Sequence, residues 1–116
     1  MAAKARTTTE KALDGLAKRL AGCKSLRSGS IAFLMPDRSG GEYRIDCQPG
    51  SARVTDGASQ RTHHVEVIGS SAKVRALISG DRDPVKVFLS GGVRLRGDLR
   101  YASDLALELG LIEEPL

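Results

Sequence analysis

The residues of this chain best suited to nucleophilic or metal chemistry are two cysteines and two histidines. Cys23 and Cys47 lie far apart in the sequence, whereas His63 and His64 are adjacent. Neighbouring residues on a strand point to opposite faces, so the two histidines cannot easily share one metal ion. A catalytic thiol needs a positioned base, and only His63 would share a sheet face with Cys47. We therefore predict no metal, no cofactor, no catalytic residue and no enzymatic activity, and we expect both thiols to be free and buried.

Glycine pairs and aspartates fit structural roles in this sequence. Gly40–Gly41 and Gly91–Gly92 lack the strand-to-helix context of a dinucleotide fingerprint or a P-loop, so they predict turns. Asp83 and Asp98 precede expected helices, where an aspartate side chain can cap the first N–H groups. Because no remaining group of polar residues has a spacing typical of catalysis, the apolar positions are the candidates for function.

Hydrophobic periodicity predicts the elements that must position those apolar side chains. A period of 3.6 indicates helices in three stretches: residues 9–21, 70–79 and 98–109. In the last one the expected apolar stripe is Leu99, Ala102, Leu105, Ala106 and Leu109. A period of two indicates strands in five stretches: residues 30–35, 42–47, 51–55, 62–68 and 93–97. A further short helix is expected after Asp83–Pro84.

This order of elements predicts an α+β fold with a five-stranded, mainly antiparallel sheet and helices packed on one face. The fifth strand is separated from the fourth by helices, so we expect it to pair in parallel or at a distance. The 116 residues suit one domain, 1–116, in which we expect residues 1–7 to be disordered.

The net charge of +4 is concentrated near the N-terminus, where residues 1–30 hold seven Lys or Arg and two acids. The basic residues of the first helix form either a face that is simply exposed to solvent or a face that makes transient contact with an anionic membrane. Nucleic-acid binding is disfavoured because aromatic residues make up only 3% of the chain. We find neither an apolar run of about 20 residues nor a secretory signal, so we expect a cytoplasmic protein.

Residues 77–109 carry a more specific pattern. It consists of a Leu-rich helix, Gly, Asp-Pro, a short helix, Gly, an alternating strand, Gly-Asp, and a helix with Ala and Leu inward. The matching positions are Leu77, Gly80, Asp83, Pro84, Gly91, Val93, Leu95, Gly97, Asp98, Ala102 and Leu105. Together with the upstream helix and the GSIAF and EYRID strands, this order resembles the sterol carrier protein type 2 family. Gly92 departs from a frequent Lys of that family, and the chain ends in EEPL without a peroxisomal address.

The resemblance implies a non-enzymatic carrier with a hydrophobic tunnel between sheet and helices. The partner would be an apolar small molecule: a lipid, a fatty acyl chain or acyl-CoA, or a sterol-like ligand. The candidate lining residues are Leu16, Leu20, Phe33, Ile45, Val65, Val67, Leu77, Phe88, Leu95, Leu105 and Leu109. The alternative is an accessory or protein-interaction module that has the same fold and no free-lipid binding. The sequence leaves open whether the interior is hollow or filled, and whether the chain forms a homodimer.

Overall fold

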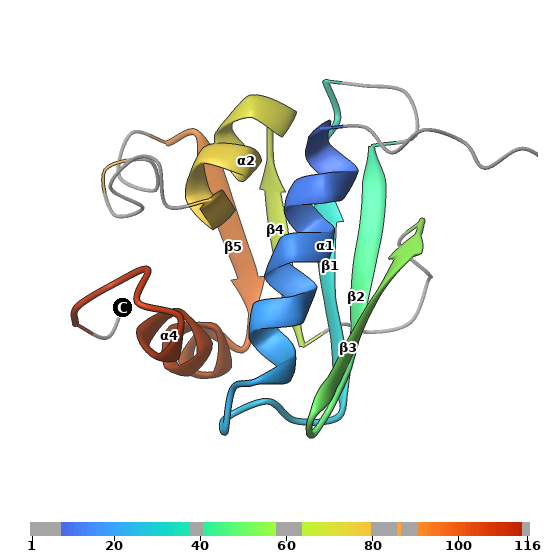
Figure 1. Cartoon of the computed structure of the whole chain (residues 1–116). Coiled ribbons are helices and arrows are strands. Elements are labelled where there is room, and N and C mark those ends of the chain that lie inside the picture. Colours follow the sequence, from blue (N-terminus) through green and yellow to red (C-terminus); the bar gives the residue numbers. More distant parts are fainter. Residues whose placement is uncertain (1–7, 38–40, 58–63, 80–85, 87–90, 115–116) are drawn as a thin grey trace, which may run out of the picture.

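The computed structural model describes residues 8–37, 41–57, 64–79, 86 and 91–114, and within them three helices cover one face of a five-stranded sheet (Figure 1). The elements are α1 Thr8–Ala21, β1 Gly29–Leu34, β2 Glu42–Gln48, β3 Ser51–Asp56, β4 Val65–Gly69, α2 Ser71–Ser79, β5 Val93–Gly97 and α4 Leu99–Glu108. This arrangement confirms the predicted α+β fold. The expectations for residues 1–7, for His63 and for the helix after Asp83 lie outside the described residues.

The sheet has the strand order β3-β2-β1-β4-β5. β2 pairs antiparallel with both β1 and β3, and β5 pairs antiparallel with β4. The expectation that β5 would pair in parallel or at a distance was wrong, because β5 returns beside β4 in the opposite direction. The parallel pair is β1 with β4, since β4 lies on the far side of β1 from the hairpin strands.

Alternation in the strands sets one face of the sheet against the helices and turns the other to solvent. In β2, Tyr43, Ile45 and Cys47 are buried between less buried neighbours. In β5, Val93 is buried, whereas Arg94 and Arg96 are exposed. Cys23 and Cys47 are both free and buried, as predicted.

α1 supplies much of the core. Its residues Leu13, Leu16, Ala17 and Leu20 follow the predicted helical spacing and are all at most 5% exposed. The helix lies across β2 and β3 and packs against α2 (Figure 1). The burial of this apolar stripe therefore fixes α1 firmly on one half of the sheet.

α4 begins and ends with specific backbone bonds. The Asp98 side chain accepts a hydrogen bond from the Tyr101 N–H at 3.0 Å, which confirms the predicted cap. At the other end Gly110 has a φ of +75°, and its N–H bonds to the Leu107 carbonyl while the Leu111 N–H bonds to the Ala106 carbonyl. This pair of bonds is a Schellman motif, which needs a left-handed residue at the glycine position.

The expected apolar stripe of α4 was wrong at its first member. Leu99 is 48% exposed, whereas Tyr101, Ser103 and Leu105 are buried. Side chains on a helix lean toward its N-terminus, so a leucine at the first position projects past the end of the helix.

Candidate functional site

An apolar cavity of about 90 Å³ lies between the sheet and the three described helices. Its walls come from α1, β1, β4, α2, β5, α4 and the residue pair after α4. The lining residues are Leu16, Leu20, Ile31, Phe33, Val65, Val67, Leu77, Ile78, Leu95, Ala102, Leu105, Ala106, Leu109 and Leu111. Every lining side chain is aliphatic or aromatic hydrocarbon, so the cavity offers burial and no polar anchor.

Nine of the residues predicted from the sequence meet around this cavity: Leu16, Leu20, Phe33, Val65, Val67, Leu77, Leu95, Leu105 and Leu109. That they contact a ligand stays a prediction. Ile45 is absent from the lining because it lies on β2, in the packed core on the α1 side, with no exposed surface. Phe88 lies outside the described residues.

Five lining residues were not among those predicted: Ile31, Ile78, Ala102, Ala106 and Leu111. Four of them occupy apolar positions of the expected strands and helices, and periodicity alone did not separate core from cavity wall. Leu111 had a signal of its own. An apolar residue one position after a C-terminal helix glycine commonly packs back on the last turn of the helix.

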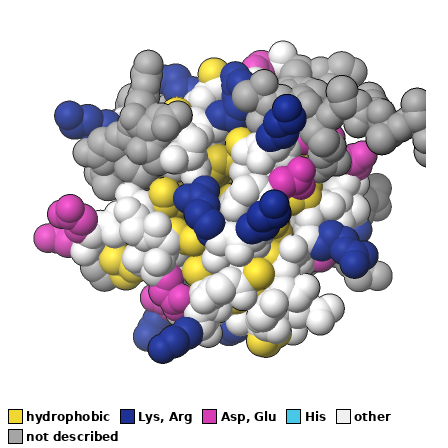
Figure 2. All heavy atoms as spheres, viewed as in Figure 1, with side chains coloured by type: hydrophobic (Ala, Val, Ile, Leu, Met, Phe, Trp, Pro, Cys, Tyr) yellow, Lys and Arg dark blue, Asp and Glu magenta, His cyan; other side chains and the backbone are white. Residues whose placement is uncertain are grey.

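The cavity reaches the surface through side chains that are only partly buried, among them Leu77, Leu95, Ala102 and Leu109. Figure 2 shows apolar side chains at the surface of the helical side, with Lys and Arg beside them. A cavity of about 150 Å³ is known to hold benzene, so 90 Å³ holds only a small part of a long chain. A long chain would therefore have to extend beyond this space or displace one of its walls.

Polar bonds join α4 to the segment after α1, residues 24–27. The Glu108 carboxylate accepts hydrogen bonds from the N–H of Lys24 at 2.7 Å and of Ser25 at 2.8 Å, and also from the Ser25 hydroxyl. The Ser25 hydroxyl and the backbone N–H groups hold the pKa of Glu108 below its usual range, because they stabilise the charged form.

A second set of contacts joins the same segment to the start of α4. The Tyr101 hydroxyl donates to the Arg27 carbonyl and accepts from the Arg27 N–H, both at 3.2 Å. The Arg27 guanidinium lies 4.6 Å from the centre of the Tyr101 ring and 3.5 Å from the Asp98 carboxylate. Tyr101 is 1% exposed, and this burial raises the pKa of its hydroxyl.

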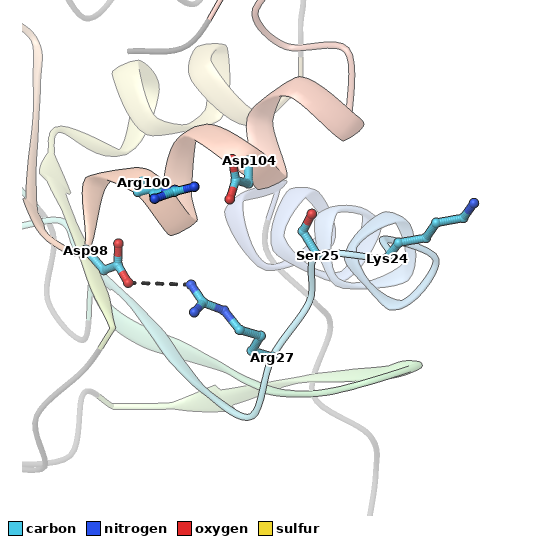
Figure 3. A pocket seen from close by; sticks show the side chains of 6 residues that line it. All are labelled: Lys24, Ser25, Arg27, Asp98, Arg100 and Asp104. Carbon is cyan, nitrogen blue, oxygen red and sulfur yellow. Dashed lines mark hydrogen bonds and ion pairs between the residues drawn. The ribbon is translucent and has the colours of Figure 1, made fainter.

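A charged pocket of about 460 Å³ lies on the outer flank of α4 (Figure 3). Its lining residues are Lys24, Ser25, Arg27, Asp98, Arg100 and Asp104. In Figure 3 Arg27 reaches Asp98, Arg100 and Asp104 point toward one another, and Lys24 points away. Opposite charges thus face one another here, and all six lining residues are polar or charged, which does not suit a hydrocarbon ligand.

The described thiols are poorly suited to nucleophilic chemistry. Burial raises the pKa of Cys47 to about 11, whereas a reactive cysteine needs a lowered pKa. Burial also raises the pKa of Cys23, and the neighbouring Glu108 carboxylate adds to the shift. Within the described ranges, no three His, Cys, Asp or Glu side chains are grouped so that they could hold a metal ion. In the same residues, no helix is both long and apolar enough to cross a membrane.

The model of the SCP-2 sterol transfer family matches residues 3–107. The chain belongs to this family. Members of the family are carriers and not enzymes, and they bind or transfer lipids or sterols. A search of curated protein sequences gave no match.

Solved structures of sterol carrier proteins share the fold. The sterol carrier protein domain 2 of Helicoverpa armigera has a TM-score of 0.61 at 23% identity, covering 91% of this chain and 84% of that one. The palmitated SCP2L2 of Aedes aegypti has a TM-score of 0.66 at 16% identity, covering 89% and 95%.

The same fold also occurs within a much larger enzyme. The stereoselective inverting sec-alkylsulfatase from Pseudomonas sp. has a TM-score of 0.64 at 19% identity, covering 85% of this chain. The match covers only 15% of the alkylsulfatase, so the likeness concerns one part of that protein.

Proposed function

We propose that the protein is a non-enzymatic carrier that buries a long apolar chain between its sheet and helices, in the cytoplasm. The observation that carries the proposal is the cavity itself, whose fourteen lining side chains are all apolar and come from both layers of the fold. Membership of a lipid-carrier family supports the same conclusion.

The chemistry of the lining favours a fatty acyl chain, free or as acyl-CoA, or a sterol-like molecule. Each methylene removed from water contributes about 0.8 kcal/mol, so a long chain can bind without a polar anchor. The palmitated state of the Aedes aegypti protein supports the acyl class.

Native mass spectrometry of the purified protein with added palmitate tests the carrier function. We expect a one-to-one complex with wild type, and a weaker one with Ala106→Leu, which fills part of the cavity from α4. Ala12→Leu, at a partly buried position on α1 away from the cavity, serves as the matched control. An unliganded mass at every palmitate concentration would contradict the proposal.

We also propose that the basic face of α1 makes transient contact with anionic membranes. Lys11 and Lys18 are exposed on this helix, and Arg19 donates to the Ile78 carbonyl at the cavity wall. Cosedimentation with phosphatidylserine vesicles should weaken at high salt, because screening shortens the attraction to about 8–10 Å. Binding to the vesicles should also weaken when Lys11 and Lys18 are changed to Gln. Equal binding in all samples would contradict the membrane contact and mean that these residues are simply exposed to solvent.

An accessory module is the second candidate, favoured by the occurrence of this fold as a small part of the alkylsulfatase. The two functions differ in one observable property. A carrier takes up free lipid on its own, whereas a module of this kind stays unliganded and acts through a protein partner.

A further inference from the structure

α4 makes far fewer close contacts to the sheet than α1 does. α1 crosses β2 and β3 and packs on α2, whereas α4 comes close to the sheet chiefly at β4. Even so, three α4 positions, Ala102, Leu105 and Ala106, and the cap residue Leu109 line the cavity. The helix therefore lies over a partly empty space, and contacts at its two ends must contribute to its position.

The N-terminal end of α4 is fixed. The Asp98 N–H donates to the His64 carbonyl at 2.6 Å, and Tyr101 is inserted beneath Arg27 with 1% of its surface exposed. β5 ends at Gly97, directly before the helix. Gly97 has a φ of +101°, and a Cβ there would lie 2.3 Å from the His64 carbonyl oxygen. This end is consequently a tight, well-defined joint.

The other end is attached in a different way. Glu108, in the last turn, is exposed and reaches across to the N–H groups of Lys24 and Ser25 and to the Ser25 hydroxyl. The segment bonded to Glu108 is anchored in the core, since Cys23 and Leu26 on either side of it are 8% and 3% exposed. One water-accessible side chain thus adds polar bonds between the end of α4 and a segment flanked by buried residues, beside the apolar packing of Ile112, which is 9% exposed, and water can replace the polar bonds when they break.

We propose that α4 is a lid that turns about its joint at Gly97–Asp98, and that Glu108 is the latch that holds it closed over the cavity. This inference rests on the proposed carrier function. A long chain exceeds the cavity of about 90 Å³ as it stands, and in this proposal the ligand-bound state has the lid displaced. If only a fraction of the protein molecules is in the conformation that can bind the ligand, the apparent affinity is the intrinsic affinity multiplied by that fraction. Glu108 is then a positioning residue that limits both the rate of loading and the apparent affinity.

The first test is the loading rate of cis-parinaric acid, a fluorescent long-chain fatty acid, followed by stopped flow. Glu108→Ala should load roughly three- to tenfold faster than wild type and bind more tightly, because the closed state loses its latch. Asp104→Ala removes the same charge from the same helix, outside the latch, and should load like wild type. Equal rates in all three proteins would overturn the latch.

The second test closes the lid covalently. Glu108 contributes to the raised pKa of the Cys23 thiol, so the two side chains are neighbours, and Glu108→Cys offers Cys23 a partner for a disulfide whose formation is checked by mass spectrometry. The oxidised variant should load at least tenfold more slowly than the same protein after dithiothreitol. Unchanged loading after complete oxidation would overturn the lid while leaving the carrier function in place. If no form of the protein, wild type included, takes up the probe, the carrier function itself fails.

The third test needs no ligand. Amide hydrogen exchange of Glu108→Ala should accelerate in residues 99–108 and remain unchanged in α1 and the sheet. Acceleration of equal size throughout the protein would show that Glu108 supports global stability only, and would contradict the latch.

Discussion

Helices cover the two halves of the sheet, the β2–β3 side and the β4–β5 side, in contrasting ways. On the β2–β3 side, α1 presses a stripe of buried leucines onto the core, and the cavity lining takes no residue from β2 or β3, although Leu16 and Leu20 of the stripe border the cavity. On the β4–β5 side, α4 and its cap residue present two partly buried alanines, the buried Leu105 and the partly buried Leu109 to the apolar space, and polar contacts with residues 24–27 hold the ends of the helix. One half of the fold is thus built for stability, while the other gives up packing and gains an apolar space.

The largest difference should come from truncating one leucine on each side. Leu13 is completely buried, so Leu13→Ala should cost about 3–5 kcal/mol in the free energy of unfolding, within the range for close-packed cores. Leu109 borders the cavity and has fewer contacts to lose, so Leu109→Ala should cost less than about 2 kcal/mol. Leu109→Ala should also weaken palmitate binding.

Urea denaturation of the two variants measures this contrast. Two equal losses at the upper end of the range would mean that the α4 side is packed as tightly as the α1 side. The comparison between the two halves would then fail.

A smaller effect is expected from the pH dependence of the α4 side. Glu108 has a folded-state pKa below its ordinary value of 4.5, so its bonds stabilise the folded state at neutral pH. That contribution is present above the unfolded pKa and is lost as the pH falls through the folded pKa. The stability difference between wild type and Glu108→Gln should therefore be constant from pH 6 to 7 and shrink below about pH 4.5.

Chemical denaturation of both proteins across pH 3–7 checks this expectation. A difference that stays constant down to pH 3 would show that the Glu108 charge does not stabilise the contact with residues 24–27.

Much of the fold could be predicted from the sequence because its signals are local. Alternation in residues 42–47 and helical spacing in α1 depend only on which face of an element meets the core. Asp98 and Gly110 mark the ends of α4 through bonds within a few residues. The parallel pairing of β1 with β4 has no such local signal, since strand order is decided by how the whole chain packs.

The site could be predicted in part for the same reason. Apolar periodicity selected most of the side chains that meet at the cavity, but it also selected Ile45, because core and cavity wall have the same apolar character. Tyr101 and Glu108 were missed. Their partners lie 74 and 83–84 positions earlier in the chain, so no spacing rule could connect them.

The most direct test of a hollow, ligand-binding interior is the melting temperature in the presence of fatty acids of increasing length. A ligand that binds only the folded state adds about 2.7 kcal/mol at a hundredfold excess over Kd. For a domain of this size, 1 kcal/mol raises the melting temperature by roughly 3–6 °C. Hexadecanoate should therefore raise it by several degrees and octanoate by much less, since each missing methylene removes about 0.8 kcal/mol of burial. A melting temperature unchanged by fatty acids of every length, by acyl-CoA and by sterol would contradict the carrier function and show that the interior is a solid core.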